Sequence, residues 1–107
     1  MKNRFNWIFE LLKAQYISAQ SEYLRGSDPE NDAEALLAAL ENLAGRAKQR
    51  QGDFPGEEQY DLWLTEYIET IHDVLERARR GEELEPLLTK GRERITSLQD
   101  DIRLHLK

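Results

Sequence analysis

Apolar residues recur every three or four positions through four successive stretches of this chain, with polar residues between them. The pattern is clearest from residue 57 to residue 80, where the apolar side chains fall on one arc of about 140° when residues are placed 100° apart. They are Tyr60, Trp63, Leu64, Tyr67, Ile68, Ile71, Val74, Leu75 and Ala78. The pattern predicts an amphipathic helix, and no stretch shows the alternation that is typical of a β-strand.

Glycine and proline mark three breaks between the four stretches. Gly26 is followed by Pro29, the segment 51–56 carries the strongest turn signal, and Gly81 precedes Pro86. Glycine is common just after a helix, and proline just inside the start of one. We therefore expect helices at about 3–25, 29–50, 57–80 and 86–106. Because short connections favour antiparallel neighbours, residues 1–107 should form a single-domain, all-α antiparallel bundle of four helices.

Gly91 lies on the inward apolar stripe of the last predicted helix, although it has no side chain to bury. A glycine inside a helix costs roughly 1 kcal/mol relative to alanine. We therefore expect a neighbouring helix or a large aromatic side chain to approach closely at this position.

The first predicted helix carries two apolar lines instead of one. Its main stripe is accompanied, on nearly the opposite side, by Trp7, Leu11 and Ala14, with Ser18 beyond them. One bundle cannot easily bury both lines. Either this helix sits centrally or Trp7 folds back over the end of the last helix, or the second line is an interface for a partner or a homodimer.

The net negative charge of the chain is concentrated in one stretch, which covers most of the predicted helix 57–80 and the turn before it. The 107 residues include 21 acids and 15 bases, and eight of the acids lie between Arg50 and Arg77 with no lysine or arginine among them. A field of one sign is useful for attracting a positive partner, although a charged helix face can also serve solubility alone. The acidic side and the one apolar residue within it predict a partner-binding surface made of Asp61, Leu62, Glu66, Glu69, Asp73 and Glu76.

Composition narrows the classes of partner and compartment. Net acidity argues against nonspecific binding to nucleic acid, and the basic clusters at residues 46–50 and 77–80 fall where helix ends favour cations. No apolar run approaches the roughly 20 residues of a membrane span, and no signal peptide is evident. The absence of cysteine excludes disulfides and thiolate metal sites and is compatible with a reducing compartment.

Catalytic chemistry is poorly represented. Glu69 and His72 have the Glu-x-x-His spacing of a di-iron bundle, but such a site needs a second pair, and His105 has no glutamate three positions before it. A magnesium-dependent nucleotide hydrolase would need carboxylates from two helices to converge, whereas the acids here point mostly outward. We therefore expect that the protein is not an enzyme and that it binds no metal and no cofactor.

Part of the chain resembles a known family. The sequence Phe54-Pro55-Gly56, then Ile71, Val74 and Leu75, and then Leu88-Thr89-x-Gly91 is similar to the small all-helical immunity proteins of type VI secretion systems. In particular, it resembles the immunity protein that neutralises an NAD(P)-glycohydrolase effector. The similarity covers about residues 54–95. It implies a non-catalytic protein that binds a toxin in the cytoplasm of the producing cell and occupies its active site.

Two other functions stay open at this point. A homo-oligomeric scaffold or adaptor could use the second apolar line of the first helix, with no toxin partner. A metal- or nucleotide-dependent helical enzyme is the third reading. The leading hypothesis is an inhibitor that acts by direct binding.

Overall fold

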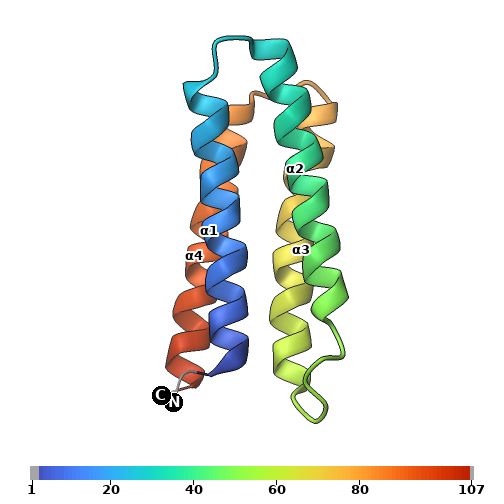
Figure 1. Ribbon diagram of the computed structural model, residues 1–107, viewed down its shortest axis with the longest axis vertical. Coiled ribbons are helices and arrows are strands. Elements are labelled where there is room, and N and C mark those ends of the chain that lie inside the picture. The colour runs from blue at the N-terminus through green and yellow to red at the C-terminus, as the bar shows by residue number, and fades with distance from the viewer. Residues whose placement is uncertain (1–2, 107) are drawn as a thin grey trace.

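The computed structural model describes residues 3–106 and contains four α-helices joined by three short connections (Figure 1). The helices are α1 (Arg4–Arg25), α2 (Pro29–Arg50), α3 (Glu58–Arg79) and α4 (Leu84–His105). No strand occurs among the described residues. The chain is therefore an all-α four-helix bundle, as the hydrophobic pattern predicts.

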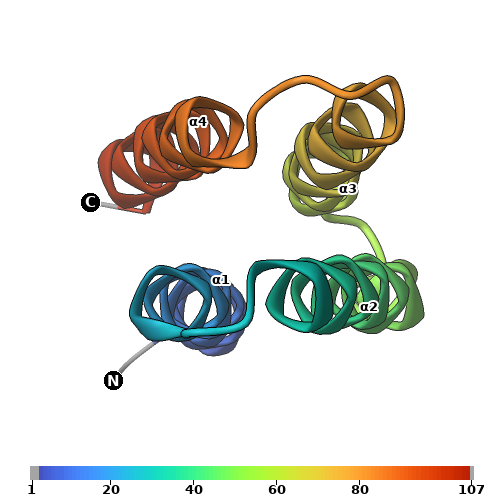
Figure 2. The same cartoon turned by 90° about the horizontal axis from the view of Figure 1, so that it is seen from above.

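The helices stand at the corners of a square when the bundle is viewed along its length (Figure 2). Each helix packs against the next one in the chain, and α1 closes the square against α4. Helices α1 and α3 are diagonal to each other (Figure 2). Since α1 occupies a corner like the other helices, a central position does not account for its second apolar line.

Local sequence signals set several of the helix ends. The side-chain oxygen of Asn3 accepts a hydrogen bond from the backbone N–H of Asn6 at 3.1 Å, and Asp28 caps α2 in the same way through Asn31 at 3.4 Å. Helix α4 begins at Leu84, two residues before the predicted start, so that Pro86 lies within the first turn. Proline is tolerated there because the N–H groups of a first turn have no partner inside the helix.

Aromatic rings fill the end of the bundle that carries both chain termini. The ring of Phe5 stacks on Tyr60 at 4.3 Å and on Trp63 at 5.8 Å between centroids, and Phe54 meets Phe5 edge-on at 5.4 Å. Phe54 comes from the connection between α2 and α3. These contacts join α1, α3 and that connection, so the end of the bundle is closed by packed side chains.

Two buried tyrosine hydroxyls tie helices together. Tyr16 Oη donates to the Leu88 carbonyl at 2.7 Å, and Tyr67 Oη donates to the Leu12 carbonyl at 2.9 Å. Burial raises the pKa of both phenols, so both stay protonated donors. A Cβ added at Gly91 would lie 2.4 Å from Tyr16 Oη, which confirms that a large aromatic approaches this glycine closely.

The end of α3 gives a first testable prediction. Gly81 has a φ of +93°, and the N–H of Glu82 bonds the carbonyl of Arg77 around it. Because left-handed backbone costs other residues about 1–2 kcal/mol, Gly81→Ala should lower the free energy of unfolding by that amount. Gly45→Ala is the matched control: it has regular helical backbone and open space around its Cβ, so it should raise stability by about 1 kcal/mol. Urea titrations in which both substitutions changed the free energy of unfolding in the same direction would contradict this account.

Candidate functional site

The acids of α3 do point away from the core, but they do not form one uniform surface. Glu69, Asp73 and Glu76 are exposed, Glu66 is half-buried beside α4, and Asp61 is half-buried beside the connection from α2. Leu62 lies among these acids with 56% of its surface exposed. The predicted set therefore divides into residues on the outer side of α3 and residues at its two flanks.

Asp61 supports the connection between α2 and α3. Its carboxylate accepts a hydrogen bond from the backbone N–H of Gly52 at 3.0 Å. Nearby, Gln51 Nε2 donates to Thr65 Oγ1 at 2.7 Å and lies 3.4 Å from the Asp61 carbonyl. These contacts explain the position of Asp61 by local structure, so it is the least available of the six residues for a partner.

Neighbouring arginines compensate part of the negative charge. Glu66 pairs with Arg94 of α4 at 2.9 Å, Asp73 pairs with Arg77 at 3.7 Å, and Glu76 pairs with Arg80. Such exposed pairs are worth little to stability, about 0–1 kcal/mol each, but they weaken the local negative field.

Two further acids on the outer side of α3 have no ion-pair partner within residues 3–106. They are Glu58, one turn before Leu62, and Glu69. We define the acidic face of α3 as the exposed residues along this side: Glu58, Leu62, Glu69, Asp73 and Glu76. It presents an apolar side chain between two carboxylates that form no ion pair with an arginine or lysine of residues 3–106.

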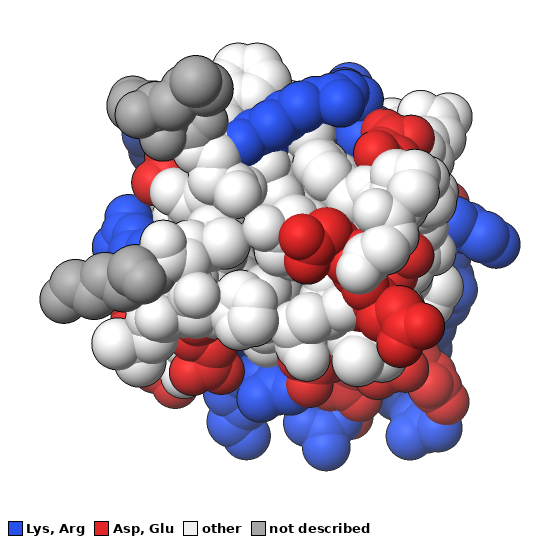
Figure 3. Space-filling model, turned by 90° about the horizontal axis from the view of Figure 1, so that it is seen from below, with Lys and Arg blue, Asp and Glu red and all other residues white. Residues whose placement is uncertain are grey.

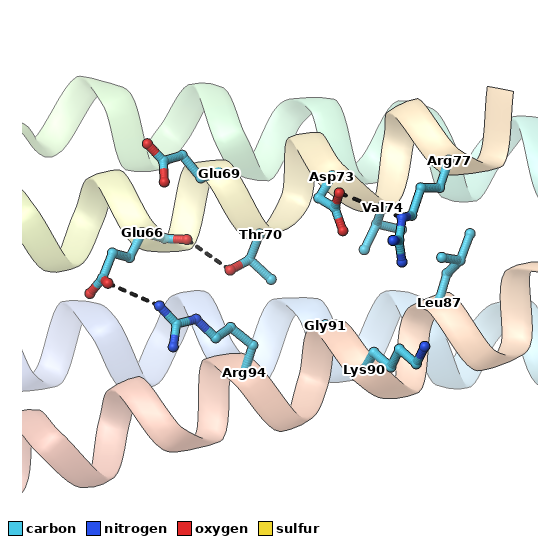
Figure 4. Close-up of a pocket in the computed structure, with 10 residues that line it drawn as sticks. All are labelled: Glu66, Glu69, Thr70, Asp73, Val74, Arg77, Leu87, Lys90, Gly91 and Arg94. Carbon is cyan, nitrogen blue, oxygen red and sulfur yellow. Dashed lines mark hydrogen bonds and ion pairs between the residues drawn. The ribbon is translucent and has the colours of Figure 1, made fainter. Parts of the chain in front are cut away.

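A groove of about 310 Å³ runs beside this face, between α3 and α4 (Figure 4). One wall comes from α3 and carries carboxylates together with Arg77, and the other comes from α4 and carries Lys90 and Arg94. Leu87, Val74 and Gly91 supply its apolar part. The groove therefore presents charges of both signs within one surface.

Sequence reasoning missed Lys90 and Arg94 as part of this surface. A signal was present, because each directly precedes a residue of the inward α4 stripe, Gly91 and Ile95. In an antiparallel pair, residues that flank the inward stripe border the neighbouring helix. What the sequence could not tell was which of the two neighbours, α1 or α3, they would face.

The second predicted surface is also open. Trp7 and Leu11 on α1 are 55% and 43% exposed, and Ala14 is exposed as well. Trp7 is thus not buried beneath the end of α4. Seen from the end that carries both termini, residues other than Lys, Arg, Asp and Glu cover most of the middle, and acidic side chains lie mainly in the right half of the view and along its lower edge (Figure 3).

No constellation for metal chemistry is assembled in residues 3–106. No three or more His, Cys, Asp or Glu side chains in this range come together in a way that could hold a metal ion. His72 is exposed near the boundary with α2, and the His105 ring packs edge-on against Trp63 at 5.2 Å. None of the four described helices has the length and apolar character needed to cross a membrane.

The chain was compared with models of known protein families, with curated proteins and with solved structures, and none of the three comparisons found a match. Functional inference therefore rests on the surfaces of the bundle.

Proposed function

We propose that this protein is an immunity protein or inhibitor that binds a secreted toxin in the cytoplasm of the producing cell and blocks its active site. The observation that carries the proposal is the acidic face of α3, where Leu62 is 56% exposed between Glu58 and Glu69. An exposed apolar side chain can serve as the anchor of an interface toward which the surrounding charges guide a partner. The resemblance described above for residues 54–95 suggests the same class of protein, although none of the three comparisons found a match.

The charges of this face suit binding to a positive cleft. Glu58 and Glu69 can accept ion pairs from a partner without breaking a pair inside the bundle. Attraction between unlike charges speeds the encounter, whereas buried apolar contacts slow dissociation. In this mechanism the carboxylates guide the toxin onto the face and Leu62 holds it there. Such an inhibitor needs no catalytic group of its own, and an NAD(P)-glycohydrolase is the toxin class that the resemblance suggests.

Co-expression with the product of an adjacent gene tests the proposal. A toxic neighbour should be neutralised and should co-purify with this chain. Leu62→Glu should then weaken binding by more than about tenfold, since it replaces an anchor by a charge. Glu69→Lys should lower mainly the association rate, with a weaker dependence on salt. Surface plasmon resonance at two ionic strengths would measure both effects.

Glu93→Lys is the matched control, since it makes the same charge change at an exposed position of α4 outside the acidic face. It should leave the affinity close to that of the wild type. Normal toxin binding by both Leu62→Glu and Glu69→Lys would exclude the acidic face as the interface. If no neighbouring gene product is toxic or is bound, the proposed function itself is wrong.

A further inference from the structure

The outer stripe of α1, made of Trp7, Leu11, Ala14 and Ser18, has no partner within the bundle. Its members follow a spacing of four, three and four residues, which is the spacing of helices that pack along their length. All four are exposed, whereas the main apolar stripe on nearly the opposite side of α1 is buried in the core. The stripe thus has the pattern of a helix–helix contact, but the chain supplies no helix to cover it.

The sizes of these four side chains change along the stripe. The two large ones, Trp7 and Leu11, come first, and the two small ones, Ala14 and Ser18, follow. A second copy of α1 lying antiparallel would set Trp7 opposite Ser18 and Leu11 opposite Ala14. Both pairs share one centre, between residues 12 and 13. A parallel copy would instead set Trp7 against Trp7, so large-against-small packing favours the antiparallel arrangement.

Charges beside the stripe match the same arrangement. Arg4 and Glu22 are both exposed and lie about five helical turns apart, so they share one side of the helix. The structure agrees, because Arg4 lies over the ring of Phe54, just beyond α2, and Glu22 lines a hollow between α1 and α2. Their midpoint is residue 13. In the antiparallel pair, Arg4 of each copy therefore comes opposite Glu22 of the other.

We infer that the outer stripe of α1 is the contact surface of a two-fold symmetric homodimer in which the two α1 helices run antiparallel. A two-fold axis makes one self-complementary patch sufficient, because each contact occurs twice. The apolar pairs and the charged pairs involve different side chains, but their centres along α1 agree to within half a residue. Since α1 is diagonal to α3, the dimer leaves the acidic face open (Figure 2). This inference does not depend on the proposed function.

Sedimentation equilibrium of the full chain tests the dimer. The mass should rise with concentration from 12.5 kDa toward twice that value, because one helix per subunit gives a small interface. Trp7→Glu should keep the protein at the mass of the monomer at every concentration. Leu104→Glu is the control, since Leu104 is a 70% exposed leucine on α4 outside the stripe, and it should leave the association unchanged. A wild-type protein that stays at 12.5 kDa at millimolar concentration, or a dimer that Trp7→Glu does not weaken, overturns the proposal.

A charge exchange tests the antiparallel register. Arg4→Glu and Glu22→Arg should each weaken the dimer several-fold, because each sets like charges opposite one another. The double variant Arg4→Glu/Glu22→Arg should recover the wild-type dissociation constant, since it restores both opposite pairs with their signs exchanged. Circular dichroism checks that all three variants keep their helical content. Single variants without effect, or a double variant as weak as the sum of the two, would overturn the register.

Discussion

Replacing Phe5 by alanine is expected to lower the free energy of unfolding by about 3–5 kcal/mol. Phe5 is fully buried, and its ring contacts those of Phe9, Phe54, Tyr60 and Trp63. Truncation removes the apolar surface of the ring and leaves a cavity among neighbours that are themselves held by packing. A loss of this size is a large part of the roughly 5–15 kcal/mol that stabilises an ordinary domain.

Chemical denaturation followed by circular dichroism measures this loss, and Leu104→Ala serves as its control. Leu104 lies near the same end of the bundle but is 70% exposed, so its truncation should change stability by less than about 0.5 kcal/mol. Tryptophan fluorescence should shift in Phe5→Ala as well, since Trp63 packs against the missing ring. Equal stability of the two variants would mean that the aromatic end of the bundle is not part of the cooperative core.

The fold could be predicted from the sequence because the spacing of apolar residues in each helix indicates a side that is buried. Every residue on the apolar arc of α3 is buried or half-buried, and the helix ends differ from the expected ones by two residues at most. The difference at Leu84 has a local cause, because a proline is accepted at any of the first few positions of a helix. Periodicity and turn residues act over short distances, and a bundle with short connections adds few long-range choices.

The candidate site could be predicted only as far as one helix determines it. That α3 turns its acids outward follows from its own period, and the structure agrees. That Arg94 reaches Glu66, and that Gly52 engages Asp61, depends on how α4 and the α2–α3 connection settle against α3. The sequence of α3 alone does not determine how these neighbours pack against it. The acids therefore look uniform along the chain but differ in three dimensions.

The second apolar line of α1 illustrates the same limit. The sequence indicated that one bundle cannot easily bury both lines. In the structure, Phe5 is fully buried and Trp7 is exposed. Periodicity could not decide whether α1 lies at the centre or at a corner, since that depends on the other three helices. Once the corner is known, the exposed line can be recognised as a surface that the other three helices leave uncovered.

The second large loss of stability is expected where Gly91 lies in close contact with Tyr16. An alanine Cβ at position 91 would lie 2.4 Å from Tyr16 Oη, so the phenol would have to move and give up its hydrogen bond to the Leu88 carbonyl. Overpacking and a buried hydroxyl without a partner together cost about 2–5 kcal/mol. The alanine regains only about 1 kcal/mol of helix propensity. Gly91→Ala should therefore lower the free energy of unfolding by a net amount of about 1–4 kcal/mol.

A double-mutant cycle with Tyr16→Phe separates this contact from any general intolerance of α4 to a side chain at position 91. Without the hydroxyl, the nearest atoms to the new Cβ are Tyr16 Cζ and Val74 Cγ2, both at 3.2 Å, a spacing that small shifts can relieve. In the Tyr16→Phe background, Gly91→Ala should therefore cost less than about 1 kcal/mol, because helix propensity offsets the remaining crowding. Urea titrations of the four proteins give the coupling directly. An equal loss of unfolding free energy in both backgrounds would show that the hydroxyl is not what excludes a side chain at position 91. The glycine would then be required because Val74 of α3 packs close to it.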